Sequence, residues 1–128
     1  MATKERKNKL IKLADEVIRE SSICQNNVII SESYNGQIAA FSVSVALSGL
    51  KPAVALYYSG KGSSDVDKKK IIELLAAMYK RDTNSNLNVS AFFAQVIGAN
   101  SNEERTLRTS IIEYAIALKL SIRTFSFQ

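Results

Sequence analysis

The sequence of 128 residues contains no histidine, no tryptophan, one cysteine (Cys24) and one proline (Pro52). The absence of histidine excludes imidazole acid–base catalysis, Ser–His and Cys–His nucleophile systems, and every zinc or haem site that uses histidine. A single cysteine excludes an intrachain disulfide and a CxxC metal site, and it is typical of a reducing cytoplasm. We therefore expect a protein that is not an enzyme and has no cofactor and no metal.

The length and the balance of residue types fit one globular domain. Apolar residues make up 46% and charged residues 23% of the chain, which are ordinary values for a globular protein. No apolar signal-peptide core follows the charged start of the chain, and the longest apolar-rich stretch, Ile38–Tyr58, is interrupted by serine, glycine, lysine and proline. We expect a single domain over residues 1–128, a cytoplasmic location and no membrane contact.

The net charge of +5 is unevenly distributed along the chain. Residues 1–12 have five basic residues against one glutamate, and residues 51–81 have seven against three acidic residues, so each segment carries +4. Residues 13–50 have one arginine against four acidic residues, and the remaining residues are neutral overall. Two basic segments beside an acidic one favour a polyanionic partner.

Helical spacing of apolar residues is clear at both ends of the chain. The segment Lys4–Glu20 places apolar residues on one stripe, with charged residues around the rest. The clearest stripe is near the C-terminus, where Ser101–Glu104 is the expected capping box. The members of that stripe are Leu107, Ile111, Tyr114, Ala115, Leu118, Ile122 and Phe125.

Two further helices are predicted between these segments. Lys68–Arg81 has an amphipathic pattern, and Ser64–Asp67 before it has the residue types of a helix start. Asn88 or Ser90 is the expected cap of a short helix that ends at Gly98. The polar stretch Asp82–Asn88 between them is expected to be a mobile loop.

The middle of the chain is compatible with two interpretations. Phe41–Val45 alternates and is rich in β-branched residues, so it could form a hairpin with Ala53–Tyr58. An isolated two-stranded hairpin is rarely stable, however, and no other segment supplies strands. Gly49 equally suits the C-terminus of one helix, and Pro52 the first position of the next. We expect two helices here, and therefore an all-α, compact single-domain bundle of five to six helices with essentially no sheet.

The central segment resembles a known family. The stretches Tyr34–Ser42 (YNGQIAAFS) and Ser48–Tyr57 (SGLKPAVALY) are similar to the signature of the small α-helical subunit of type III-B CRISPR effector complexes, the Cmr complexes. The later segments Lys70–Leu75 and Leu107–Leu120 also resemble that family in order and spacing. The β-branched run Val43–Val45 departs from it, because the family has a plainer helical stretch there.

The resemblance implies both a fold and a function. It implies a non-catalytic α-helical bundle, several copies of which stack into the minor (belly) filament of an antiviral ribonucleoprotein complex. The backbone subunits of such complexes hold the guide RNA and cut RNA, and target RNA pairs with the guide in the groove between the two filaments. The expected partners are therefore the other Cmr subunits, further copies of this chain, the guide RNA and the target RNA.

Basic residues are the candidate RNA contacts, because each lysine or arginine can bind a phosphate. The preferred group is Lys61 with Lys68, Lys69 and Lys70, which concentrate positive charge at one helix start beside a glycine-containing loop. The first and last predicted helices carry the alternative contacts. These are Lys4, Arg6, Lys7, Lys9, Arg105 and Arg108.

Other motifs are better explained by structure than by chemistry. Gly60–Ser64 precedes a helix but lacks the spacing of a phosphate-binding loop. The pairs Asp65/Asp67 and Glu103/Glu104 suit the first turn of a helix, where acids favour the positive end of the helix dipole. Of the adjacent residues Tyr57 and Tyr58, one is expected at the surface, because neighbouring helical residues point about 100° apart.

Two other function classes are less well supported. A stand-alone small helical nucleic-acid-binding protein, such as a repressor, would need two helices joined by a tight turn that leads into a polar recognition helix, and we do not expect such a pair. A small enzyme would need histidine or cysteine chemistry, or a convincing group of carboxylates.

Overall fold

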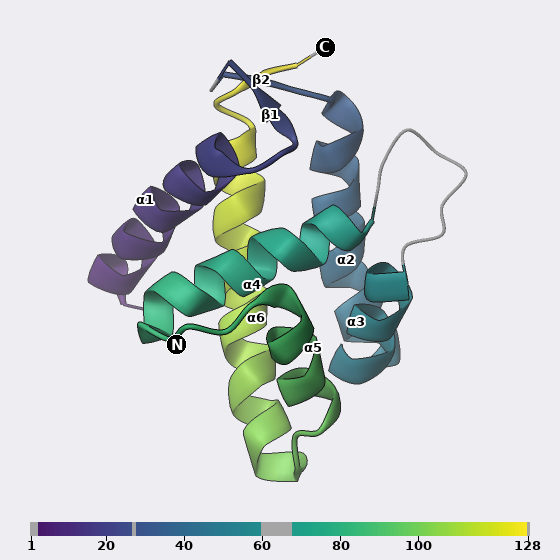
Figure 1. Ribbon diagram of the computed structural model, residues 1–128. Helices are drawn as coiled ribbons and strands as arrows, with labels where there is room; N and C mark the ends of the chain where they lie inside the picture. The colour runs from purple at the N-terminus through teal and green to yellow at the C-terminus, as the bar shows by residue number, and fades with distance from the viewer. Residues whose placement is uncertain (1–2, 27, 60–67, 128) are drawn as a thin grey trace.

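The computed structural model describes residues 3–26, 28–59 and 68–127, drawn as ribbons in Figure 1. These residues form six α-helices, which confirms the predicted all-α bundle, and three two-residue strands. The helices are α1 (Lys4–Glu20), α2 (Glu32–Ser48), α3 (Leu50–Ser59), α4 (Lys69–Thr83), α5 (Val89–Ile97) and α6 (Ser101–Ile122). The strands are β1 (Cys24–Gln25), β2 (Ile29–Ile30) and β3 (Ser126–Phe127).

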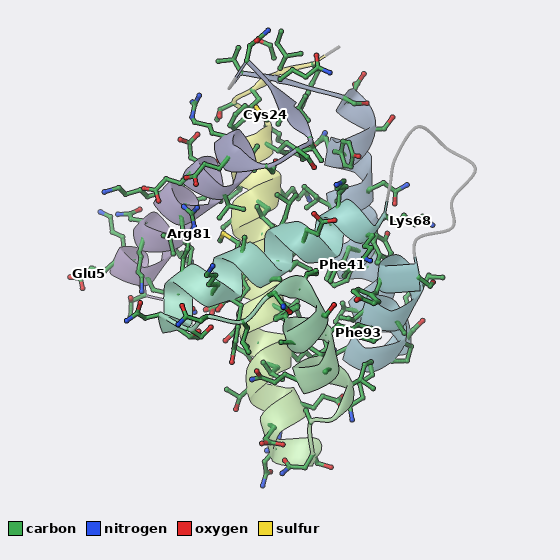
Figure 2. All side chains as sticks on the ribbon, viewed as in Figure 1. Glu5, Cys24, Phe41, Lys68, Arg81 and Phe93 are labelled. Atoms are coloured by element: carbon green, nitrogen blue, oxygen red, sulfur yellow. The ribbon has the colours of Figure 1, made fainter. Side chains whose placement is uncertain are left out.

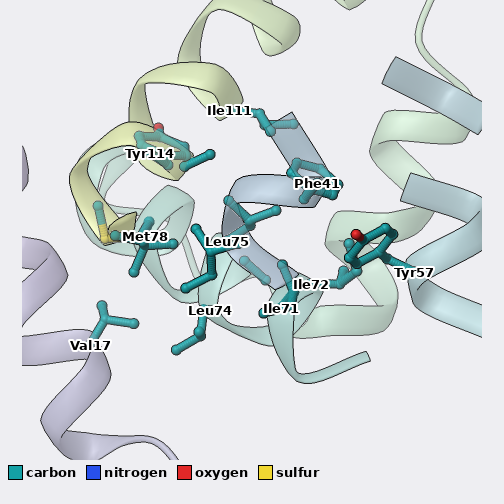
Figure 3. Packing of buried hydrophobic residues seen from close by; sticks show 14 of the residues in the cluster. Val17, Phe41, Tyr57, Ile71, Ile72, Leu74, Leu75, Met78, Ile111 and Tyr114 are labelled. Carbon is teal, nitrogen blue, oxygen red and sulfur yellow. The ribbon is translucent and has the colours of Figure 1, made fainter. Parts of the chain in front are cut away.

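Helix α6 is the centre of the bundle and packs against α1, α2 and α4 (Figure 1). All seven residues of its predicted apolar stripe are buried, including Phe125 just beyond the helix. Figure 3 shows how Ile111 and Tyr114 of this helix approach Phe41 of α2 and Leu75 and Met78 of α4. No helix in the described part of the chain is both long enough and apolar enough to cross a membrane.

The ambiguous middle of the chain is a pair of helices. The turn between α2 and α3 is Gly49, whose φ of +93° is strained for any residue with a side chain. Pro52 is the third residue of α3 and not its first, a position that also tolerates proline because the first-turn N–H groups have no acceptor within the helix. The run Val43–Val45 is helical because Phe41 and Val45 pack into the core.

Side-chain caps define several helix starts. Asn88 caps α5, and its Oδ1 accepts a hydrogen bond from the backbone N–H of Ala91 at 2.8 Å. The capping box of α6 is formed by Asn100 and Glu103, one residue earlier than expected. Each side chain accepts a hydrogen bond from the backbone N–H of the other residue, at 2.9 Å. The expected helix start at Ser64–Asp67 lies outside the described residues.

The small sheet is a feature that the sequence analysis did not predict. Strand β2 pairs antiparallel with β1 and parallel with β3, and two-residue strands are too short to leave an alternating pattern in the sequence. The pairing places the end of the chain beside the α1–α2 connection, at the top of Figure 1.

Candidate nucleic-acid interface

The preferred lysines meet at the first turn of α4. Lys68 is the residue before the helix, and Lys69 and Lys70 are its first two residues. We call these three residues the α4 entry; all three are half-buried. The Nζ atom of Lys68 lies 5.4 Å from the ring centre of Tyr57, and that of Lys69 lies 4.7 Å from the ring centre of Tyr58. Lys70 pairs with Glu73, with 3.6 Å between Nζ and Oε2.

Aromatic rings hold the α4 entry lysines in place. Tyr57 is buried edge-on against Phe41, with ring centres 5.2 Å apart, and burial raises the pKa of its hydroxyl. Tyr58 is half-buried and stacks on Phe93 of α5, with ring centres 4.0 Å apart and a 12° angle between the rings. Figure 2 shows Lys68 and Phe93 on neighbouring elements of this side of the molecule. A cation held over a ring keeps its charge, and the positive end of the α4 dipole adds to it.

Two of the N-terminal candidates are structural. Arg6 forms a two-pronged ion pair with Asp82 at the end of α4, with N–O distances of 3.1 and 3.0 Å, and its Nε donates to Glu113 of α6 at 3.0 Å. Lys9 donates to the same Asp82 at 3.2 Å. Arg6 and Lys9 therefore help to join α1 to the rest of the bundle. Arg6 is half-buried there, whereas the side chain of Lys9 stays 54% exposed.

Asp82 is the centre of this junction, which we call the Asp82 junction (Arg6, Lys9, Asp82, Glu113 and Tyr114). The side chain of Asp82 is 7% exposed, and the fully buried Tyr114 donates its hydroxyl proton to Asp82 at 2.6 Å. Burial alone would raise the pKa of Asp82, but the hydrogen bonds from Arg6, Tyr114 and Lys9 outweigh it and lower the pKa to about 2. Burial and, after it, the hydrogen bond to Asp82 raise the pKa of Tyr114, and the hydrogen bonds to Asp82 and Glu113 raise the pKa of Arg6.

Sequence reasoning missed Asp82, which it placed at the start of a mobile loop. The residue instead belongs to α4 and is held by two other helices. Its position four residues after Met78, on the buried side of an amphipathic helix, was the available signal. Arg81, its neighbour, pairs with Glu16 at 3.3 Å and Glu20 at 2.8 Å, and so joins α4 to α1 a second time.

The remaining described candidates are exposed. Lys4 and Lys7 lie on α1, and Arg105 and Arg108 lie on α6. Within the described ranges no salt bridge involves any of these four residues. They form a second set of cations, separate from the α4 entry.

Several other predicted features have a structural explanation or lie outside the described residues. Lys61, the loop Gly60–Ser64 and the pair Asp65/Asp67 all fall outside them. Glu103 caps α6, and Glu104 lies 3.8 Å from Lys51, whose Nζ also donates to the carbonyl of Ala99 at 2.7 Å. Among the residues that the structure describes, no group of three acidic, cysteine or histidine side chains is placed to hold a metal ion. Burial raises the pKa of the Cys24 thiol, as suits an unreactive side chain.

Comparisons with models of protein families, with curated proteins and with solved structures gave no match to this chain.

Proposed function

We propose that this chain is a non-catalytic structural subunit of a type III-B CRISPR ribonucleoprotein complex, in which copies stack into the minor filament and hold target RNA paired to the guide. The proposal rests on the sequence resemblance and on one structural observation, the α4 entry. Three lysines meet there at the positive end of a helix, and two of them are held over tyrosine rings.

The chemistry of the α4 entry suits a phosphate backbone. Lysine ammonium groups contact phosphates as point charges and carry no base specificity, which suits a complex in which base pairing reads the sequence. Rings beneath Lys68 and Lys69 restrict their rotamers, so less side-chain entropy is lost when a phosphate binds. The interaction should therefore depend on salt and be indifferent to target sequence.

The Asp82 junction narrows the choice of contact surface. It makes Arg6 and Lys9 weaker candidates than Lys4 and Lys7, because both side chains donate to the carboxylate of Asp82. Lys4 and Lys7 remain exposed on α1, but within the described part of the chain neither forms a cation–ring contact. The α4 entry is therefore the better supported of the two surfaces.

The alternative, a stand-alone small helical nucleic-acid-binding protein, gains one feature from the structure. Helices α5 and α6 are joined by only three residues, 98–100, so the tight turn that the sequence analysis did not expect is present. The first turn of α6 nevertheless carries Glu103 and Glu104, which would repel DNA phosphates at the position where a recognition helix contacts them. We therefore favour the complex subunit.

The proposal is tested by isolating the chain from its native cell with an affinity tag at either end. The expected result is co-purification, in defined ratios, with larger subunits and with short RNAs that share a common repeat-derived end. Recovery of duplex DNA in place of guide RNA would support the alternative. Recovery of the chain alone, under conditions that preserve other ribonucleoprotein complexes, would contradict the proposal.

A further inference from the structure

Helix α2 presents an apolar ridge to solvent. Val43 and Leu47 are 56% and 81% exposed, and each follows a buried residue, Phe41 or Val45, by two positions. Because residues two apart point about 200° apart on a helix, this α2 ridge (Val43 and Leu47) faces away from the core. The chain has no ionisable acidic or basic residue between Glu32 and Lys51, so the ridge is also uncharged.

A second apolar feature lies between α1 and α6. We call it the α6 groove; its volume is about 230 Å³. Ile116 and Leu120 form its α6 wall, and each is 51% exposed. An apolar cavity of about 150 Å³ accommodates benzene, so the groove has room for one or two aliphatic side chains. The groove is lined by Lys7, Leu10, Ile11, Glu113, Ile116, Ala117 and Leu120.

The ridge and the groove match in spacing and in charge. On α2, Glu32 precedes Val43 by eleven residues and Leu47 follows Val43 by four; on α6, Arg105 precedes Ile116 by eleven and Leu120 follows Ile116 by four. If two helices lie parallel, these equal spacings, about 16 Å and 6 Å, place the residues of all three pairs at the same heights along the two helix axes. The pairs are Glu32 with Arg105, Val43 with Ile116, and Leu47 with Leu120.

We infer that the α2 ridge of one copy lies in the α6 groove of the next copy, with Glu32 opposite Arg105. This inference rests on the proposed function in one respect, since it names the surfaces through which copies stack. Both Glu32 and Arg105 are exposed, and neither forms a salt bridge among the described residues. Contact between two different surfaces leaves one of each unoccupied at the ends, so the contact can be repeated along a filament.

The charge of the chain favours a second copy through these surfaces. Two copies that each carry +5 repel, and the repulsion is strongest where lysines and arginines face each other. The α2 ridge brings no cation toward Lys7 at the edge of the groove, and its one flanking acid comes level with Arg105. The charge on these two surfaces is therefore complementary, in contrast with the excess of cations elsewhere.

The test uses two variants that each remove one surface, Leu47→Glu on the ridge and Leu120→Glu in the groove. Sedimentation equilibrium of the wild-type chain should show open-ended association, and each variant alone should be monomeric. An equimolar mixture should form a 1:1 dimer and nothing larger, because only one intact ridge and one intact groove remain. If Leu120→Glu does not fold, Ile116→Glu takes its place.

Three results would overturn the inference. One is a wild-type chain that stays monomeric at about 1 mM, a concentration at which even a weak contact is half populated. Another is a variant mixture that does not dimerise, as expected if the ridge packs on itself across a two-fold axis. The third is association that neither variant changes.

The register is tested by charge reversal. Glu32→Arg should weaken association roughly two- to fivefold, the range for an exposed ion pair, and adding Arg105→Glu should restore it. The matched control pairs Glu32→Arg with Arg108→Glu, which makes the same charge change one helical turn away and should not restore association. Equal rescue by both would contradict the register.

These results are independent of RNA. Wild-type association with a complementing mixture, together with failure of the chain to co-purify with guide RNA, would uphold the inference and contradict the proposed function. The reverse outcome would leave the proposed function standing on the α4 entry alone.

Discussion

The Asp82 junction and the α4 entry use the same kind of residue in opposite ways. At the junction, Arg6 and Lys9 form ion pairs with a carboxylate that is 7% exposed, and these pairs help to hold α1, α4 and α6 together. At the α4 entry, Lys68 faces a tyrosine ring, which positions a cation without neutralising it. Residues 1–12 and 51–81 each carry +4, so the partner that each cation meets across the fold, and not the local charge, separates the two regions.

The largest expected effect follows from removing the carboxylate at the junction. Asp82→Ala leaves the guanidinium of Arg6 and the hydroxyl of Tyr114 without their main acceptor, and should lower the free energy of unfolding by about 3 kcal/mol in urea titrations. The matched control is Asp15→Ala, which breaks an exposed pair with Arg19 and should cost about 0.5 kcal/mol. An equal decrease in the free energy of unfolding for the two variants would show that the Asp82 junction stabilises the fold no more than an ordinary surface ion pair does.

Acid should weaken the junction in a defined range of pH. The pKa of Asp82 falls from its ordinary value of 3.8 to about 2 on folding, so its stabilisation is complete above about pH 5 and is lost progressively as the pH falls through 2. The loss attributable to Asp82 is about 2 kcal/mol. Urea titrations between pH 5 and pH 2 should show a steeper decline for the wild type than for Asp82→Asn. Parallel declines would contradict the low pKa.

A smaller loss is expected from the hydroxyl of Tyr114. Tyr114→Phe keeps the buried ring but removes the donor 2.6 Å from Asp82, and should lower the free energy of unfolding by about 1.5 kcal/mol. Added to Asp82→Asn, it should cost clearly less than it does alone, because the two side chains share one interaction. Additive losses would show that the hydroxyl stabilises the core by another contact.

The smallest effect on stability is expected at the α4 entry. Lys68→Ala removes one cation–ring contact at a half-buried position and should lower the free energy of unfolding by about 0.5 kcal/mol. Thermal unfolding of Lys68→Ala and Lys68→Met would show whether the charge or the aliphatic chain supplies that amount. A loss as large as that of Asp82→Ala would make the α4 entry a structural element like the junction.

The sequence predicted the features that depend on local spacing. The stripe of α6 from Leu107 to Phe125 and the glycine turn at Gly49 follow from periodicity and backbone preference, and both are confirmed. The capping box was placed one residue late, because Asn100 and Ser101 are both good caps and only the backbone angles separate them. Local pattern therefore predicts helices well and their first residues less well.

The sequence could not show which cations are already paired. Arg6 and Asp82 are 76 residues apart, and nothing in the sequence near Arg6 distinguishes it from Lys7. Tyr58 and Phe93 are likewise brought together only by the packing of α3 against α5. Long-range contacts of this kind have no periodic signature in the sequence. Only the three-dimensional structure therefore shows which cations form ion pairs that join the helices.

The central claim is that the α4 entry contacts RNA while the Asp82 junction does not. Its most direct test is target-RNA binding by the assembled complex that contains Lys68→Glu, Lys69→Glu and Lys70→Glu together, measured over a range of salt concentrations. The matched control reverses Lys4, Lys12 and Lys80, which are exposed and lie outside both regions. The α4 variant should bind weakly, with the slope of log K against log salt reduced by about two, while the control binds as the wild type does. Normal binding and an unchanged slope in the α4 variant, with loss in the control, would contradict the account.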